Sequence, residues 1–416
     1  MRFSSLKPGF WGELPSDGRW LFITRFARLF AYGFLSVVLV LYLVAVGLSE
    51  FQAGTLLTLT LVGDSAITLW ITTQADRFGR RRMLLVGAGL MLFAGVLFIL
   101  TENYWLLLLA ATIGVISPGG NEVGPFLSIE QAALTQLVPG QQRTAILAWY
   151  NLVGSFATAL GAVCSGGLVQ ALQSAGLPDV LGYRAVIFGY AAFGLVLGAI
   201  FLRLTESVEV ASTSPRSAVL SLGLDSSRGT VLRLSALFSL DAFAGGFIIQ
   251  SLVAYWFHAR FGLEPAVLGS IFFGTNILAG ISALSAAWVA SKVGLINTMV
   301  FTHLPSNVLL MLIPLMPSLP LAIGMLLLRS CIAQMDVPTR QSYVMAVVKP
   351  EERSAAAGVT SIARTLGSSL SPVFTGALLS NPALAGLPFL ISGGLKIIYD
   401  LVIWRSFSQL KPPEES

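Results

Sequence analysis

The chain has 416 residues, of which 55% are hydrophobic and only 11% are charged, with a mean hydropathy of +0.80 and a formal net charge of +5. Soluble domains carry roughly 25% charged residues. This composition therefore excludes an ordinary soluble domain and indicates an integral membrane protein.

Twelve apolar stretches follow one another along the chain. A hydrocarbon core about 30 Å thick needs roughly 20 apolar residues per spanning helix, and backbone amides in lipid must bond within their own segment. Strict alternation of the kind found in barrel strands is missing, so we predict helices throughout. The predicted spans are residues 20–47, 52–73, 83–101, 105–137, 143–170, 183–203, 231–258, 265–290, 297–316, 319–347, 352–380 and 384–405.

The distribution of charge predicts the topology. The first 19 residues are polar and interrupted by Pro8 and Pro15, so they do not form the apolar core of a signal peptide. If the amino terminus is cytoplasmic, Arg184 and Arg260 are the only basic residues in outer loops, which is the positive-inside pattern. We expect a multi-pass protein of the plasma or inner membrane with both termini in the cytoplasm. The positive net charge follows from this topology and does not indicate nucleic-acid binding.

The longest polar stretch divides the chain into two similar halves. Adding 215 to the numbering places Gly79 on Gly294, and adding 210 places Gly166 on Gly376. Such a repeat predicts two parallel six-helix bundles with a site between them. The expected fold is all-α, with twelve transmembrane helices in two pseudo-symmetric bundles. The predicted division is an amino-terminal segment 1–19, a bundle 20–203, a linker 204–230, a bundle 231–406 and a tail 407–416.

A charged loop separates the second and third predicted spans and reads ADRFGRRRML from residue 75. It contains Asp76, Arg77, Gly79, Arg80 and Arg81. With about twelve spans, a six-plus-six repeat and a long central loop, the sequence resembles the major facilitator superfamily of transporters. The family's signature in this loop is approximately G-x-x-x-D-R-x-G-R-R, although a threonine stands where the first glycine is expected.

The resemblance implies a conformational role for this loop. In the family the carboxylate equivalent to Asp76 latches the two halves together on the cytoplasmic side by meeting the start of helix 11. Residues 354–360 and Arg364 are the expected partners here, because a helix amino terminus attracts an anion. The second copy reads SKVG and lacks the acid, so only the first half carries the full latch. The alternative is that the loop is only a positively charged membrane anchor.

The fourth span is interrupted by the stretch SPGGNEVGP, residues 117–125. Pro118 and Pro125 each leave a carbonyl without its helical partner, and interruptions of this kind mark substrate or ion sites in transporters. Glu122 is the first candidate for a proton-coupling residue, and Asn121 is a candidate for the substrate cavity. Alternatively, the stretch is a tightly packed kink in which Glu122 is ion-paired.

The tenth span carries CIAQMDVPTRQ, residues 331–341. Asp336 is a further candidate for proton coupling. Asp336 and Arg340 are spaced i,i+4 and lie within reach of a salt bridge. Arg329 is either a ligand of an anionic substrate or the partner of a carboxylate. Glu130 and Arg340 occupy equivalent places in the two halves, so they are candidates for an ion pair across the cytoplasmic gate.

Two further acids lie inside predicted spans, where ionisable groups are costly and therefore functional candidates. Asp64 lies about 18 Å above the signature loop at 1.5 Å per residue, and Asp241 lies about ten residues into the seventh span. Each is a candidate proton site, because a desolvated carboxyl retains its proton more readily. Each is equally a candidate structural partner of Arg28 or Arg364.

Other polar residues are placed by depth near a central cavity. The candidates for substrate contacts are Tyr32, Asn151, Gln250 and Asn276, although packing or interfacial anchoring explains them equally well. With only two histidines and two cysteines, and no H-E-x-x-H or G-x-S-x-G pattern, we expect no metal and no cofactor.

These features predict a monomeric secondary transporter that moves a small molecule across the bilayer by alternating access. Proton-coupled efflux is the first interpretation, because the chain is short and has intramembrane carboxylates. Drug/proton antiporters of the family usually carry an arginine in helix 4 and G-P-x-x-G-G in helix 5, and this chain has neither. The alternatives are a proton symporter that imports a polar or anionic metabolite, with Arg329 and Arg364 reading its carboxylate, and, more remotely, a membrane enzyme or receptor.

Overall fold

The computed structural model describes residues 14–139, 143–209, 227–349 and 352–408. Within these ranges the regular structure is helical. The helices are α2 (Ser16–Ser36), α3 (Leu39–Ala45), α4 (Glu50–Phe78), α5 (Arg80–Leu100), α6 (Tyr104–Ile113), α7 (Phe126–Gln136), α8 (Arg143–Ser174), α9 (Asp179–Phe201), α10 (Arg228–Gly246), α11 (Gln250–Phe261), α12 (Pro265–Val293), α13 (Leu295–Leu312), α14 (Leu319–Ser330), α15 (Asp336–Val347), α16 (Arg353–Leu379) and α17 (Leu387–Phe407), with short 3₁₀ turns at Glu206–Val208 and Ile313–Leu315.

These helices build the twelve expected spans. Eight helical stretches are long and apolar enough to cross a membrane, one of them being α10 together with α11, and α2 with α3 makes a ninth that is bent by 42°. The fourth span consists of α6 and α7, and the tenth of α14 and α15, each with a break in the middle. The 27 residues of α16 complete the count. The chain is therefore an all-α membrane protein with twelve transmembrane segments.

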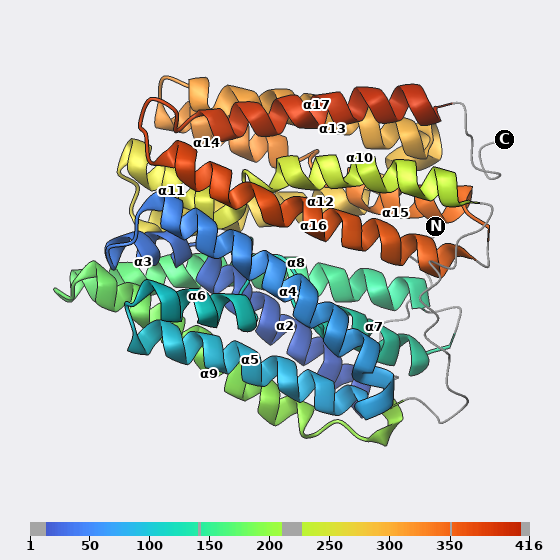
Figure 1. The fold of residues 1–416 in the computed structure, drawn as a ribbon, viewed down its shortest axis with the longest axis horizontal. Coiled ribbons are helices and arrows are strands. Elements are labelled where there is room, and N and C mark those ends of the chain that lie inside the picture. Colours follow the sequence, from blue (N-terminus) through green and yellow to red (C-terminus); the bar gives the residue numbers. More distant parts are fainter. Residues whose placement is uncertain (1–13, 140–142, 210–226, 350–351, 409–416) are drawn as a thin grey trace.

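The helices form two bundles that lie side by side along their length (Figure 1). We call α2 to α9 the first half and α10 to α17 the second half. Two ends of the molecule are also named. The basic end carries the turns at Gly79 and Gly294 and is on the right in Figure 1, and the distal end is opposite. Most of the predicted linker, residues 210–226, lies outside the described residues.

The two halves are in close contact at the distal end. Helix α4 packs on α16, and α8 packs on α12. A Cβ atom on Gly54 would lie 2.5 Å from the carbonyl oxygen of Pro372, and one on Gly269 would lie 2.5 Å from that of Ala162. Glycine is required at such crossings because the backbones of the two helices touch. The distal end is therefore sealed by small residues.

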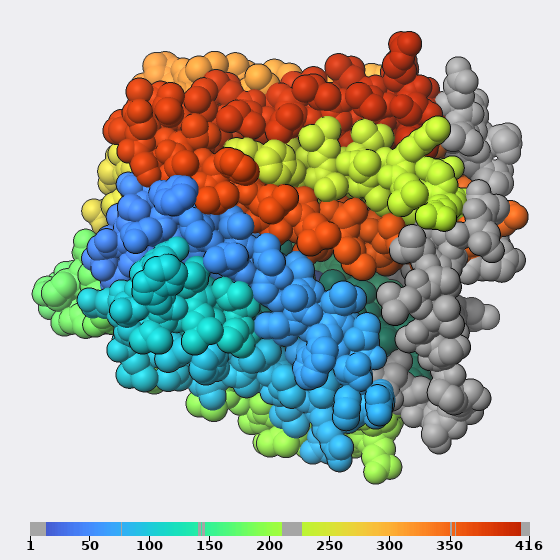
Figure 2. Space-filling view, in the orientation of Figure 1, coloured from blue at the N-terminus to red at the C-terminus, as the bar shows by residue number. Residues whose placement is uncertain are grey.

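The same helices separate toward the basic end. In Figure 2 the blue α4 and the orange α16 touch on the left, and deeper atoms are visible between them on the right. Four acceptors of the first half receive hydrogen bonds from the second half, and all four lie away from the basic end: Ser36, Glu50, Thr58 and Pro118. The protein is closed at its distal end and open at its basic end.

Candidate functional site at the centre of the bundle

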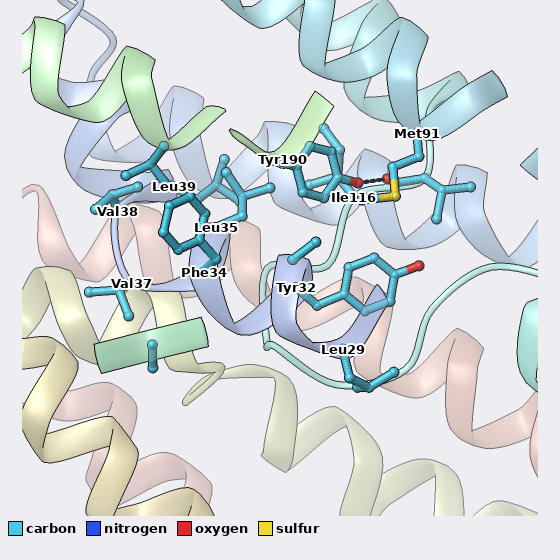
Figure 3. Packing of buried hydrophobic residues seen from close by; sticks show 14 of the residues in the cluster. Leu29, Tyr32, Phe34, Leu35, Val37, Val38, Leu39, Met91, Ile116 and Tyr190 are labelled. Carbon is cyan, nitrogen blue, oxygen red and sulfur yellow. Dashed lines mark hydrogen bonds between the residues drawn. The ribbon is translucent and has the colours of Figure 1, made fainter. Parts of the chain in front are cut away.

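The break in the fourth span is an ordered part of the interior. Its carbonyl groups, which have no helical partner, accept hydrogen bonds from side chains of neighbouring helices. The Tyr32 hydroxyl donates to Val123 at 3.2 Å, Thr158 donates to Gly120 at 3.2 Å, and Tyr190 donates to Val115. Figure 3 shows Tyr32 and Tyr190 beside this stretch near Ile116. Satisfied backbone groups are what allow a non-helical segment to persist at membrane depth.

This break and α7 carry the acids of a buried ion cluster in the first half. Arg28 donates to both carboxylate oxygens of Glu130, at 2.8 and 2.7 Å, and its Nε donates to Glu122 at 2.8 Å. Arg25 forms a second ion pair with Glu122, and Tyr150 donates to Glu130. The side chains of Arg28 and Glu130 are fully buried. Two guanidinium groups therefore neutralise two carboxylates, and Glu122 is ion-paired as in the structural alternative considered for it.

The second half contains a different cluster around Asp241 on α10. Its Oδ1 accepts from Lys396 at 2.6 Å, and its Oδ2 accepts from Arg364 at 2.9 Å and from Arg340 at 3.2 Å. Arg340 also donates to Asp336 at 2.7 Å, which confirms the predicted i,i+4 salt bridge. Pro338 lies in the first turn of α15, directly after the break at residues 331–335. A proline cannot donate to the carbonyl four residues earlier, and here that carbonyl belongs to the break.

The two clusters are related by the internal repeat with their charges reversed. Gly33 and Gly246 are 213 positions apart, and Thr158 and Ser368 are 210 apart. A Cβ on Gly33 would contact the carbonyl of Thr158, and one on Gly246 would contact that of Ser368, so these spacings mark equivalent helix crossings. At the same spacings Arg28 corresponds to Asp241 and Glu130 to Arg340. An arginine-to-glutamate pair in one half thus replaces an aspartate-to-arginine pair in the other.

The expected ion pair between Glu130 and Arg340 across the gate is not formed in this structure. Each of these residues is buried inside its own half, where it is bonded to Arg28 or to Asp241 and Asp336. To form a pair across the gate, each residue would have to leave its buried partner in its own half. That partner would then be an unpaired buried charge, which costs several kcal/mol. The reversed charges therefore stabilise each half separately.

Asp64 differs from the other intramembrane acids because it has no cationic partner among the described residues. Its side chain is 7% exposed, and its Oδ1 makes no hydrogen bond. Gly124, in the break of the fourth span, is a neighbour of this carboxyl. An ionised carboxylate in such surroundings is strongly disfavoured.

His303 and Asp400 form a buried pair that sequence reasoning missed. His303 lies in the middle of α13, and its Nδ1 is 2.9 Å from Asp400 on α17. The other Asp400 oxygen accepts from Asn307 at 3.0 Å. An i,i+4 spacing of His303 and Asn307 was the available signal, since it places both polar groups on one helix face.

The candidate cavity residues separate into two groups. Gln250 donates to Ser36 across the halves at 2.8 Å and accepts from Asn276 at 3.2 Å, so these residues form a polar closure above the centre. Tyr32 is fully buried against the break of the fourth span. Asn121 and Asn151 are exposed, in contrast to the buried Tyr32.

The signature loop is held by the beginning of the linker. The Glu209 carboxylate accepts from the backbone N–H groups of Arg80 at 2.6 Å and Arg81 at 3.1 Å, so it caps the amino terminus of α5. Gly79 has φ of +99°, as expected for a tight turn that favours glycine. Asp76 lies in the last turn of α4, but its side chain is outside the described part of the chain, as is that of Ser354. The latch between them stays a prediction, and Arg364 is bonded to Asp241.

Comparisons with known proteins agree with this architecture. A family model described as Major Facilitator Superfamily matches residues 21–372. An uncharacterized membrane protein of Saccharomyces cerevisiae, YJR124C, is 32% identical over 418 residues, with 93% of each chain covered. Two solved structures are similar at low identity. A point mutant of the nucleoside transporter NupG has a TM-score of 0.77 at 14% identity, covering 94% of this chain and 100% of that one. A D-xylose–proton symporter has a TM-score of 0.71 at 16% identity, covering 93% and 97%.

Proposed function

Because the chain belongs to the major facilitator superfamily, we propose that it is a proton-coupled secondary transporter in which Asp64 binds the proton. The coarser statement, that the chain is a multi-pass membrane transporter, rests on the family and the fold. Alternating access needs two states in which opposite ends of the bundle are sealed. The distal closure and the opening at the basic end represent one of these states.

Asp64 is the observation that carries the coupling proposal. Each of the other intramembrane acids considered as a proton site is bonded to at least one arginine: Glu122, Glu130, Asp241 and Asp336. Asp64 is buried without such a partner among the described residues, and an unpaired charge is costly inside a membrane protein. We therefore transfer the proton-coupling role from Glu122 to Asp64.

The position of Asp64 links the proton to the substrate path. Its neighbour is the break of the fourth span, and the same break carries Glu122 of the first-half cluster. Movement of that segment during the transport cycle changes the surroundings of the carboxyl. Loss of the proton in one state and uptake in the other then couples the proton gradient to the movement.

The direction of transport is a separate choice. Efflux by proton antiport is the first interpretation from the sequence, and import by symport is the second. The partly exposed Arg364 and the unpaired Arg329 favour an imported or exported anion over a cationic drug. An imposed pH gradient separates the two directions, because antiport accumulates substrate on the more acidic side of the membrane and symport on the more alkaline side.

The coupling is tested by transport in proteoliposomes. A substrate found by thermal-shift screening of the purified chain is followed with and without a pH gradient in the wild type, Asp64→Asn and the matched variant Glu122→Gln. We expect Asp64→Asn to exchange substrate in counterflow but to lose its response to the pH gradient. Accumulation by Asp64→Asn with the pH dependence of the wild type would refute the assignment. A loss of the response only in Glu122→Gln would return the role to Glu122.

A further inference from the structure

We propose that the transported substrate is an organic anion bearing a carboxylate or phosphate, and that Arg364 and Arg329 of the second half bind it. The inference rests on the proposed transport function and adds a substrate class to it. It does not depend on which carboxyl carries the proton.

The charge balance of the two clusters is the first argument. In the first half two arginines meet two glutamates, and the least buried of the four side chains is 13% exposed. In the second half three cations meet two carboxylates, because Arg340, Arg364 and Lys396 share Asp241 and Asp336. The second cluster therefore carries one positive charge more than its contacts neutralise.

No other described acid bonds to Arg364. Asp400 follows Lys396 by four residues on α17, and its two oxygens accept from His303 and Asn307. On the opposite side, Glu122 and Glu130 are matched by Arg25 and Arg28. Arg364 therefore shares Asp241 with two other cations, and its guanidinium is left to pair with a group from outside the protein.

Arg364 is the member of the cluster that a ligand can reach. Its side chain is 32% exposed, whereas those of Arg340 and Lys396 are 5% and 9% exposed. It lies eleven residues from the start of α16, about 16 Å into the bundle at 1.5 Å per residue, and it is bonded to the interior residue Asp241. Since the halves separate toward the basic end, this guanidinium is accessible from that side.

Arg329 supplies a second unneutralised cation. It lies in the last turn of α14, immediately before the break of the tenth span, and makes no ion pair with any described residue. Its Nε is buried and has no hydrogen-bond partner. Asp336, the acid that follows the break in the same span, is already bonded to Arg340. An unpaired guanidinium inside a membrane protein is costly, and its planar donors match carboxylate and phosphate oxygens.

The proposal predicts an unusual response to mutation. Removing Arg364 leaves Arg340 and Lys396 facing Asp241 and Asp336, so two cations meet two carboxylates. Unlike a structural arginine, Arg364 is therefore dispensable for stability, and Arg364→Gln and Arg329→Gln should both melt at or above the wild-type temperature in the absence of ligand. The matched control is Arg405→Gln, an exposed position in the last turn of α17.

Binding is tested by thermal stability of the purified full chain in detergent. The probes are matched pairs of an anion and its uncharged analogue: succinate with succinamide, benzoate with benzamide, glucose 6-phosphate with glucose, and AMP with adenosine. We expect at least one anion to raise the melting temperature while its uncharged analogue does not. In Arg364→Gln the apparent affinity for that anion should fall about tenfold or more, as for a lost hydrogen bond to a charged group, and Arg405→Gln should bind as the wild type does.

Each other outcome contradicts the proposal. Stabilisation only by uncharged probes, or by none, argues against an anion site. Anion binding that persists in both Arg364→Gln and Arg329→Gln removes these residues from the site, and a strongly lowered ligand-free melting temperature in Arg364→Gln makes it a structural arginine. Asp64→Asn should retain the anion-dependent shift, so a failure of proton coupling and a failure of this inference give different results.

Discussion

The two halves of this transporter use the same helix positions for ion pairs but with opposite polarity. In the first half Arg28 on α2 binds Glu130 on α7, and in the second half Asp241 on α10 binds Arg340 on α15. The first cluster is balanced and enclosed. The second has a surplus cation, and its residue Arg364 is partly exposed. Duplication of one unit has therefore produced one half that is electrostatically complete and another that retains a free positive charge.

This difference separates stability from function within one repeat. A fully matched buried cluster fixes the broken fourth span against its neighbours, because removal of any member leaves an unpaired charge. A cluster with more cations than carboxylates is not fully neutralised by the protein. Such a cluster is retained where a bound anionic ligand supplies the missing negative charge. The comparison predicts that equivalent substitutions in the two halves have unequal effects.

The largest expected effect is that of Arg28→Gln. Glu130 is fully buried and would lose its bidentate partner, and Glu122 would lose one of its two arginines. Breaking a buried pair costs about 3–5 kcal/mol. The melting temperature is measured as the temperature at which half of the purified protein remains monodisperse in size-exclusion chromatography. We expect it to be much lower in Arg28→Gln and unchanged in Arg405→Gln. A wild-type melting temperature for Arg28→Gln would contradict the structural role of this cluster.

A charge swap tests the equivalence of the two halves directly. The double variant Arg28→Asp with Glu130→Arg gives the first half the polarity of Asp241 and Arg340. It should recover part of the stability lost in Arg28→Asp alone, since an opposite-charge pair is restored at the same positions. Recovery is incomplete because Glu122 then lacks one partner. A double variant that melts no higher than Arg28→Asp would break the proposed symmetry.

The next effect concerns the contact between the halves. A side chain at Gly54 meets the Pro372 carbonyl of α16, whereas Gly89 on α5 has open space around its Cβ position. Overpacking of this kind costs about 1–3 kcal/mol, so Gly54→Leu should disfavour distal closure and Gly89→Leu should not. Distances between spin labels at the distal ends of α4 and α16 measure this. An unchanged distance distribution in Gly54→Leu would show that the crossing does not control closure.

A smaller effect is expected where the linker meets the signature loop. Glu209→Ala removes the acceptor for the backbone N–H groups of Arg80 and Arg81 and should cost about 1 kcal/mol, as for other helix caps. Glu206→Ala, in the neighbouring exposed turn, is the matched control. The two melting temperatures should differ by a few degrees. Equal values would mean that the cap contributes nothing to stability.

The smallest effect on stability is predicted for Asp64→Asn. This isosteric change leaves no cation unpaired, whereas Asp241→Asn removes the carboxylate that Arg340, Arg364 and Lys396 share. We expect a nearly unchanged melting temperature for the first variant and a clearly lower one for the second. A large loss in Asp64→Asn would indicate that the carboxyl is ionised and paired in the folded protein.

Much of the fold was predictable because it follows from the bilayer itself. Twelve apolar stretches and a repeat at spacings of 210 and 215 predicted the two bundles, and the Pro and Gly residues between Ser117 and Pro125 predicted the break in the fourth span. The Asp336–Arg340 pair was predictable because a single helix fixes its spacing. The partner of Glu130 was not predictable, because Arg28 is 102 positions away and reaches it only when α2 and α7 pack together.

The sequence by itself determined that this chain spans the membrane twelve times, that it is built from two related halves, and which few residues are charged inside it. The hydrophobic requirement of the bilayer is local and can be recognised along the chain. Only the tertiary structure decided which of those charges neutralise one another. Coulomb interactions depend on distance in space and not in sequence, and they left Asp64 without a cation and Arg329 without an anion among the described residues.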